Sequence, residues 1–249
     1  MPDKKELRYT HVSNFYDSAM DSLRSAWDIH LSNIESKSYN SGKKSHAESG
    51  HAALAILIMV MKFEADIRLI YDRKTERSDV DSRINPRKLL KRLVELRVSV
   101  GDGKFNFEKY DEYLDEILLV RNIIAHGYIY EGAIHFDDDW EVTSIEGTAV
   151  TGRDRSVLND EGITPKLNIE TSPYRIGVFD ALIVNRVIEN MRLMTGLPVR
   201  ADLISDGSSH VELSKWISSA KRGINKQRDD LLDELKTEYY SIMAMLYEG

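Results

Sequence analysis

Hydrophobic residues recur at helical spacing through the first half of the chain. They predict a first helix over residues 10–34, with one apolar stripe formed by Phe15, Ala19, Leu23, Ala26 and Trp27. A second helix is predicted over residues 47–73, and its first half is apolar on almost every side. Because an apolar surface all round requires burial, this helix is expected at the centre of a bundle.

Helix-start and helix-end residues delimit the next two segments. Asn85-Pro86 pairs a capping residue with a proline at the first helical position, which predicts a short helix ending near Val98. A fourth helix is predicted over residues 107–126, with Asn106 as its cap and Gly127 as its terminator. Four helices with short or moderate connections predict an up-and-down bundle.

The pattern changes after Gly127. Two strands are predicted over 128–136 and 140–145, joined through Asp137, Asp138 and Asp139, and Gly- and Thr-rich sequence continues to Thr171. Ser172-Pro173 then predicts a helix to about residue 195, followed by helices over 209–221 and 225–247. The expected fold is mainly α. Residues 1–127 form a helical bundle, 128–171 a small β insertion, and 172–249 a C-terminal extension whose helices complete or extend the bundle.

Composition narrows the class of protein. Of the 249 residues, 42% are hydrophobic and 30% are charged, which is typical of a soluble globular protein. The longest apolar run, residues 52–61, is roughly half as long as a membrane span requires, and the charged first residues contain no apolar signal segment. The absence of cysteine removes disulfides, thiolate zinc sites and cysteine nucleophiles. A cytoplasmic protein without membrane association is expected.

The formal charge of −7 argues against a bulk nucleic-acid coat protein but leaves room for a local basic site. Two short stretches are rich in Lys and Arg. One contains Arg87, Lys88, Lys91 and Arg92, and the other contains Lys221, Arg222, Lys226 and Arg228. Such clusters are more often solvated helix faces than binding surfaces.

Candidate chemistry concentrates at the end of the fourth predicted helix, in Arg121-Asn122-Ile123-Ile124-Ala125-His126-Gly127. This segment combines a permanent cation that can clamp a phosphate with a histidine that can move a proton near neutral pH. Arg24 and His30 have a similar spacing, but they lie mid-helix and lack the Asn, the following Gly and the helix end. The local string around Arg121, more than the spacing, makes it the candidate.

Arg121-Asn122 followed by His126, with four residues between Arg and His, resembles the signature of the HEPN superfamily. The resemblance covers about residues 10–128 in helix order, and the motif alone in residue identity. It implies a HEPN-type bundle that dimerises, so that paired motifs form a composite active site. Many such proteins are metal-independent endoribonucleases of stress-response, toxin–antitoxin and antiviral systems. Others are catalytically silent dimers that bind a protein or a nucleotide.

The resemblance implies an RNA substrate, a homodimer, an antitoxin or regulatory partner, and no cofactor. Arg121 would hold the scissile phosphate, and His126 would act as general base or acid on the ribose 2′-hydroxyl or the 5′-oxygen leaving group. Asn122 would orient His126 or donate a hydrogen bond to phosphate. Glu64 is a weaker candidate that faces the cleft, and Tyr128 is a weaker candidate for stacking on a base.

Helical geometry places Asp111, Asp115, Asn122 and His126 on one polar stripe, whereas Arg121 points toward an apolar row. Arg121 has no acidic residue at i−3 or i−4 in its own helix. A dimer interface would account for an unpaired Arg beside apolar residues. A structural interpretation stays open, in which Arg121 forms an interhelix or intermolecular salt bridge and His126 caps the carbonyls of its own helix end.

Three other segments are weaker candidates. His46, Glu48 and His51 lack the i,i+4 spacing of two histidine ligands and indicate a polar helix start. The acidic run 137–139 is typical of a solvated turn between strands. Residues 147–156 lack the Lys and the adjacent Ser or Thr of a phosphate-binding loop.

Overall fold

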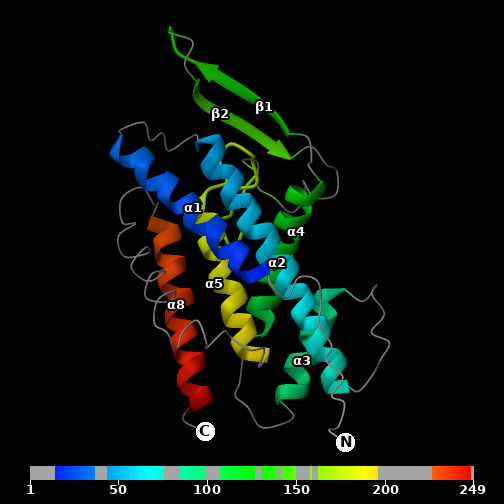
Figure 1. The fold of residues 1–249 in the computed structure, drawn as a ribbon. Helices are drawn as coiled ribbons and strands as arrows, with labels where there is room; N and C mark the ends of the chain where they lie inside the picture. Colours follow the sequence, from blue (N-terminus) through cyan, green and yellow to red (C-terminus); the bar gives the residue numbers. More distant parts are fainter. Residues whose placement is uncertain are drawn as a thin grey trace, which may run out of the picture.

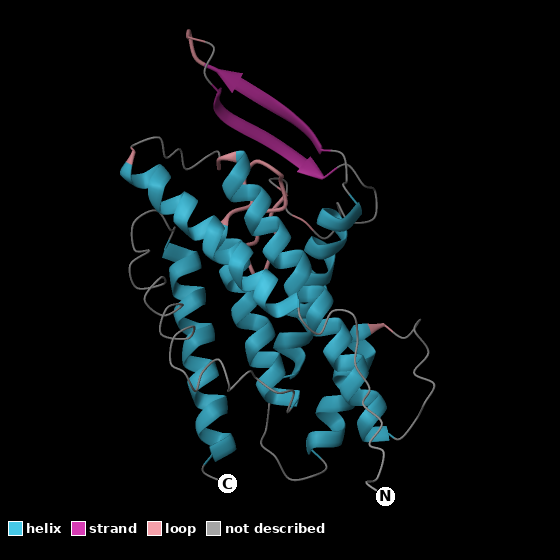
Figure 2. Cartoon of the chain, viewed as in Figure 1, coloured by secondary structure: helices cyan, strands magenta, loops and turns pink. Residues whose placement is uncertain are grey.

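The computed structural model describes residues 15–36, 44–75, 85–98, 107–126, 130–139, 142–149, 158, 162–195 and 226–247. Within these ranges the chain forms six helices and one two-stranded sheet, and the helices pack side by side (Figure 1, Figure 2). The expectation of a mainly helical bundle is confirmed. None of the helices in these ranges combines the length and the apolar character needed to cross a bilayer.

The first four helices follow the predicted order. Helix α1 spans Phe15–Glu35 and packs along α2, which spans His46–Thr75. Helices α3, Pro86–Val98, and α4, Phe107–His126, also contact α2 and have the predicted bounds. The Asn85 side chain caps α3 by accepting a hydrogen bond from the backbone N–H of Arg87 at 2.9 Å. The predicted cap and terminator of α4 lie outside the described residues.

Helix α5, Val178–Thr195, is the most completely buried of the described helices, with every residue except Glu189 buried. It contacts α1, α2, α3 and α4, and α8, Lys226–Tyr247, packs against it. The bundle is therefore centred on α5 and not on α2. The outer face of α2 leaves Leu54 44% and Met61 39% exposed, because no other described element covers it. The helix predicted over 209–221 lies outside the described residues.

The helix start predicted at Ser172-Pro173 is wrong, because α5 begins only at Val178. Ser172 instead begins a turn in which its carbonyl accepts hydrogen bonds from the N–H groups of Arg175 and Ile176. At the true start, the Asp180 carboxylate accepts a hydrogen bond from the N–H of Gly177 at 2.8 Å. Ser-Pro is a start signal for turns as well as for helices, and the contacts made by Asp180 decide between them.

The predicted pair of strands is present as β1, Tyr130–Phe136, and β2, Val142–Ala149, which pair antiparallel. Strand β2 extends beyond its predicted end at residue 145. In the connecting turn, the N–H of Asp139 donates to the carboxylate of Asp137 at 3.1 Å. Figure 1 shows the hairpin standing clear of the helices, at the end of the bundle where α4 terminates.

Candidate active site

Arg121 lies near the end of α4, at the edge where α4 meets α2. Its Nη2 donates a hydrogen bond to Oε1 of Glu64 on α2, and the two side chains are 24% and 18% exposed. The Nε of Arg121 is buried and has no hydrogen-bond partner in the described part of the chain. Arg121 thus has no acidic partner in its own helix, as expected, and forms the interhelix salt bridge that the structural interpretation allowed. Its partner lies 57 residues away on another helix, where helical periodicity carries no information.

Glu64 follows Met61 by three residues on α2, so the two side chains are neighbours, about 60° apart around the helix axis. Leu54 and Met61 are exposed large hydrophobic residues, and a Cβ added at Gly50 on the same side would meet nothing within 4 Å. We refer to Gly50, Leu54 and Met61 as the apolar strip of α2. The Arg121–Glu64 ion pair thus lies beside an uncovered apolar surface.

His126 is exposed in the last turn of α4, and Asn122 is half-buried one turn before it. Asn122 and His126 are i,i+4 neighbours and share one side of the helix. Arg121 and His126 are separated by about 140° around the helix axis. The structure therefore brings the three motif residues to one end of α4 but places Arg121 and His126 on different sides of it. Tyr128 lies outside the described residues.

The acidic part of the predicted polar stripe contacts α3. The Nε of Arg87 donates to Asp111 at 2.5 Å, and its Nη1 lies 2.7 Å from Oδ2 of Asp115. Burial raises the pKa of the Asp115 carboxyl, and the charge of Arg87 opposes that rise. Because both carboxylates stabilise the α3–α4 contact, only Asn122 and His126 of the stripe belong to the candidate site.

The second Arg–His pair does not form a site. Arg24 is exposed and pairs with Asp21 at 3.6 Å on its own helix. His30 is fully buried, with Nδ1 3.3 Å from Oε1 of Glu48 and its ring edge-on to Phe179. Arg24 therefore lies in solvent and His30 in the core, so the two side chains do not share a site.

The segment around His46 begins α2, as its polar character indicated. The Oγ of Ser45 caps the helix by accepting a hydrogen bond from the N–H of Glu48 at 3.2 Å. The full burial of Glu48 was not predicted. Among the residues that the structure describes, no group of three His, Asp or Glu is placed to hold a metal ion.

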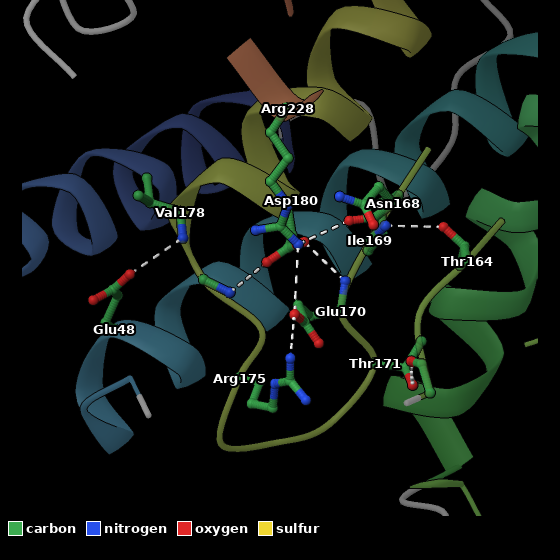
Figure 3. Close-up of polar contacts among 12 residues, drawn as sticks. Glu48, Thr164, Asn168, Ile169, Glu170, Thr171, Arg175, Val178, Asp180 and Arg228 are labelled. Atoms are coloured by element: carbon green, nitrogen blue, oxygen red, sulfur yellow. Dashed lines mark hydrogen bonds and ion pairs between the residues drawn. The ribbon is translucent and has the colours of Figure 1, made fainter. Parts of the chain in front are cut away.

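A buried ionic cluster at the start of α5 was not predicted from the sequence either (Figure 3). Asp180 is 0% exposed and accepts hydrogen bonds from the N–H groups of Gly177 and Glu170 and from Nη2 of Arg228, at 2.8–2.9 Å. Arg175 donates to the Glu170 carboxylate at 3.0 Å. Burial raises the pKa of both carboxyls, and the guanidinium of Arg228 opposes the rise. The cluster fastens α8 and the segment before α5 to the bundle.

One available signal pointed to this cluster. Asp180 follows Gly177 by three positions, which is the spacing of an acidic residue that caps a helix start. Its partner Arg228 belongs to the second basic stretch noted in the sequence, but the pairing joins positions 48 residues apart. Hydrophobic periodicity cannot identify a contact between residues so far apart in the sequence.

An open hollow of about 570 Å³ lies between α4, residues 166–168 and α8. Tyr113 forms its α4 side, and Gln227, Asp230 and Glu234 form its α8 side. Burial raises the pKa of the Tyr113 hydroxyl. Neither Arg121 nor His126 lines this hollow, so it is separate from the motif.

No protein-family model matches the chain, and neither the curated proteins nor the solved structures include a match. The likeness to HEPN proteins consequently rests on the motif in α4 and on helix order. A function therefore has to be inferred from the positions and the chemistry of the residues at the end of α4.

Proposed function

We propose that this protein is a metal-independent endoribonuclease of HEPN type that acts as a homodimer. The observation that carries the proposal is the position of Arg121, Asn122 and His126 at one end of α4, where Arg121 contacts Glu64 next to the uncovered apolar strip of α2. A phosphate-binding cation and a group that transfers protons near neutral pH are what this cleavage requires.

In the proposed reaction, His126 removes the proton of a ribose 2′-hydroxyl. The 2′-oxygen forms a bond to phosphorus, and the bond from phosphorus to the 5′-oxygen breaks. A protonated imidazole, the same histidine or that of the second copy, gives a proton to the leaving 5′-oxygen. Arg121 binds the non-bridging phosphate oxygens, whose charge grows in the transition state. The products are a 2′,3′-cyclic phosphate and a 5′-hydroxyl.

The geometry of α4 supports a composite site. Since Arg121 and His126 are about 140° apart around one helix, a phosphate held by Arg121 is poorly placed for His126 of the same helix. A second copy can bring its own α4 to the other side of that phosphate. The apolar strip of α2, with Leu54 44% and Met61 39% exposed, supplies a surface that such a copy would bury.

Glu64 supports the proposal as a positioning residue. Its contact with Arg121 fixes a long side chain at the edge of the apolar strip. The guanidinium has five N–H donors, so it can keep Glu64 on one edge and bind a phosphate with the rest.

The test is cleavage of end-labelled RNA in excess EDTA by wild-type protein, His126→Ala and Arg121→Ala. Wild type is expected to leave 2′,3′-cyclic phosphate ends, and both variants are expected to lose at least about 100-fold in rate, because each removes a group acting in the transition state. His46→Ala and Arg24→Ala are matched controls, since both residues are exposed and lie elsewhere. Equal cleavage by wild type and His126→Ala would remove the histidine from the mechanism.

A catalytically silent dimer that binds a protein or nucleotide is the second candidate. The observation that favours it is the ion pair itself, because Glu64 already occupies one edge of Arg121. A dimer that cleaves no RNA would support this function. If the protein is a nuclease, we propose that it acts in the cytoplasm, in stress response or phage defence. An antitoxin or a regulatory partner would control it.

A further inference from the structure

Helix α3 carries a basic face that the proposed reaction does not use. Its 13 residues include five Lys or Arg and one Glu. Leu89, Leu90 and Leu93 are buried. The opposite side of the helix exposes one carboxylate, Glu95, and three cations, Lys88, Lys91 and Arg92. We refer to these three residues as the α3 basic face.

Contacts on two sides hold α3 in place. The Nη1 of Arg92 donates to the hydroxyl of Tyr71 on α2 at 3.3 Å. Arg87 binds Asp111 and Asp115 on α4 through charged contacts. The α3 basic face is therefore attached to the same two helices that supply Glu64 and Arg121.

A basic side chain lies between the candidate site and the α3 basic face. Arg68 follows Glu64 by one helical turn on the outer side of α2 and is partly exposed. Tyr71, which Arg92 contacts, is about 10 Å beyond Glu64 along the helix axis. Arg121, Arg68 and the α3 basic face thus follow one another along α2.

The opposite direction from Arg121 is acidic. Residues 122–152 contain six Asp or Glu and no Lys or Arg. The turn of the hairpin, Asp137 to Asp139, is exposed. Figure 1 places the hairpin and α3 toward opposite ends of the bundle. A polyanion near Arg121 is therefore attracted toward α3 and repelled from the hairpin.

We infer that the α3 basic face binds the backbone of single-stranded RNA that continues from the scissile phosphate at Arg121. This inference rests on the proposed function, because it places that phosphate at the motif. A single strand is the occupant, since attack by the 2′-oxygen needs alignment with the departing 5′-oxygen, and an A-form duplex holds its backbone in another geometry. The strand leaves the site along α2 and avoids the acidic hairpin.

Binding is measured by fluorescence anisotropy with a labelled single-stranded RNA and the His126→Ala protein, which prevents cleavage during the titration. Lys88→Glu with Lys91→Glu is added in that background, and the dissociation constant is followed against salt. Binding is expected to weaken, and the slope of log K against log salt is expected to flatten by roughly 0.7 for each phosphate that the protein no longer neutralises. Lys88→Gln with Lys91→Gln is the milder version if the reversal impairs folding.

The control pair is Lys166→Glu with Lys236→Glu, which changes the charge equally at partly or fully exposed positions outside α3. It is expected to retain the slope of the parent. Three results would overturn the inference. RNA binding could weaken equally with the control pair and the α3 pair, it could be unchanged in the α3 pair, or the His126→Ala parent could bind no RNA. Tighter binding of duplex than of single-stranded RNA would overturn it too.

Cleavage by wild-type protein separates this inference from the proposed function. If wild type cleaves RNA and the α3 substitutions leave binding unchanged, the nuclease stands and the RNA path fails. If the α3 substitutions weaken binding but wild type cleaves nothing, the RNA surface stands and the nuclease fails.

Discussion

At the residue scale, Arg121 has two candidate anions: the carboxylate of Glu64, which it contacts, and the phosphate of the proposed substrate. The ion pair is only partly exposed, so the two charges are screened less than a surface pair would be. An orienting carboxylate limits the conformations of a long arginine side chain. Less conformational freedom then has to be given up when the phosphate binds.

Glu64→Gln keeps a hydrogen-bond acceptor but removes the charge that holds Arg121. We expect kcat for RNA cleavage to fall while KM changes little, because orientation matters most in the transition state. The free energy of unfolding is expected to fall by about 1 kcal/mol, as for a partly buried pair. Cleavage kinetics and urea unfolding measure the two effects.

Glu108→Gln, on an exposed position of α4, is the matched control for that change. A fall in unfolding free energy with kcat unchanged would make Glu64 a structural residue only. An increase in kcat would mean that the carboxylate competes with the phosphate instead of positioning the guanidinium.

At the element scale, the sequence predicts α3 and α4 well because their boundaries depend on local chemistry. Asn85 and Pro86 act within one turn of the chain, and the apolar spacing of α4 ends at His126. The start of α5 and the uncovered side of α2 depend on other elements. The same limit applies to the site: the motif is visible in the sequence, but the pairing of Arg121 with Glu64 is tertiary.

The start of α5 offers a comparison of two glycines. A Cβ at Gly177 would lie 2.9 Å from Oε1 of Glu48 and 3.1 Å from Cε of Lys44, two side chains that are 0% and 8% exposed. We expect Gly177→Ala to lower the free energy of unfolding by roughly 1–3 kcal/mol, because buried neighbours must shift. At Gly50 a Cβ would meet nothing within 4 Å in a single copy, so Gly50→Ala is expected to raise the unfolding free energy of a single copy by about 0.5–1 kcal/mol.

Urea unfolding followed by circular dichroism measures both substitutions. Equal stability of Gly177→Ala and wild type would mean that Glu48 and Lys44 accommodate the methyl group without cost.

At the scale of the whole molecule, one copy leaves an apolar helix half covered. α2 is apolar on almost every side through its first half, yet the other described elements cover only its inner face. Covering the apolar strip with a second copy would remove apolar surface from water and bring a second α4 toward the first. Catalysis and stability would then depend on the same contact.

Leu54→Glu with Met61→Glu tests that dependence, because two charges on the apolar strip would oppose its burial. Light scattering is expected to give twice the chain mass for wild type and the mass of one chain for the variant, which should also lose RNA cleavage. Tyr240→Glu, at a residue 49% exposed on α8, should stay dimeric and active. Cleavage of RNA by a monomeric variant would contradict the composite site. In that case Arg121 and His126 of one α4 would both reach the same phosphate, although they are about 140° apart around the helix.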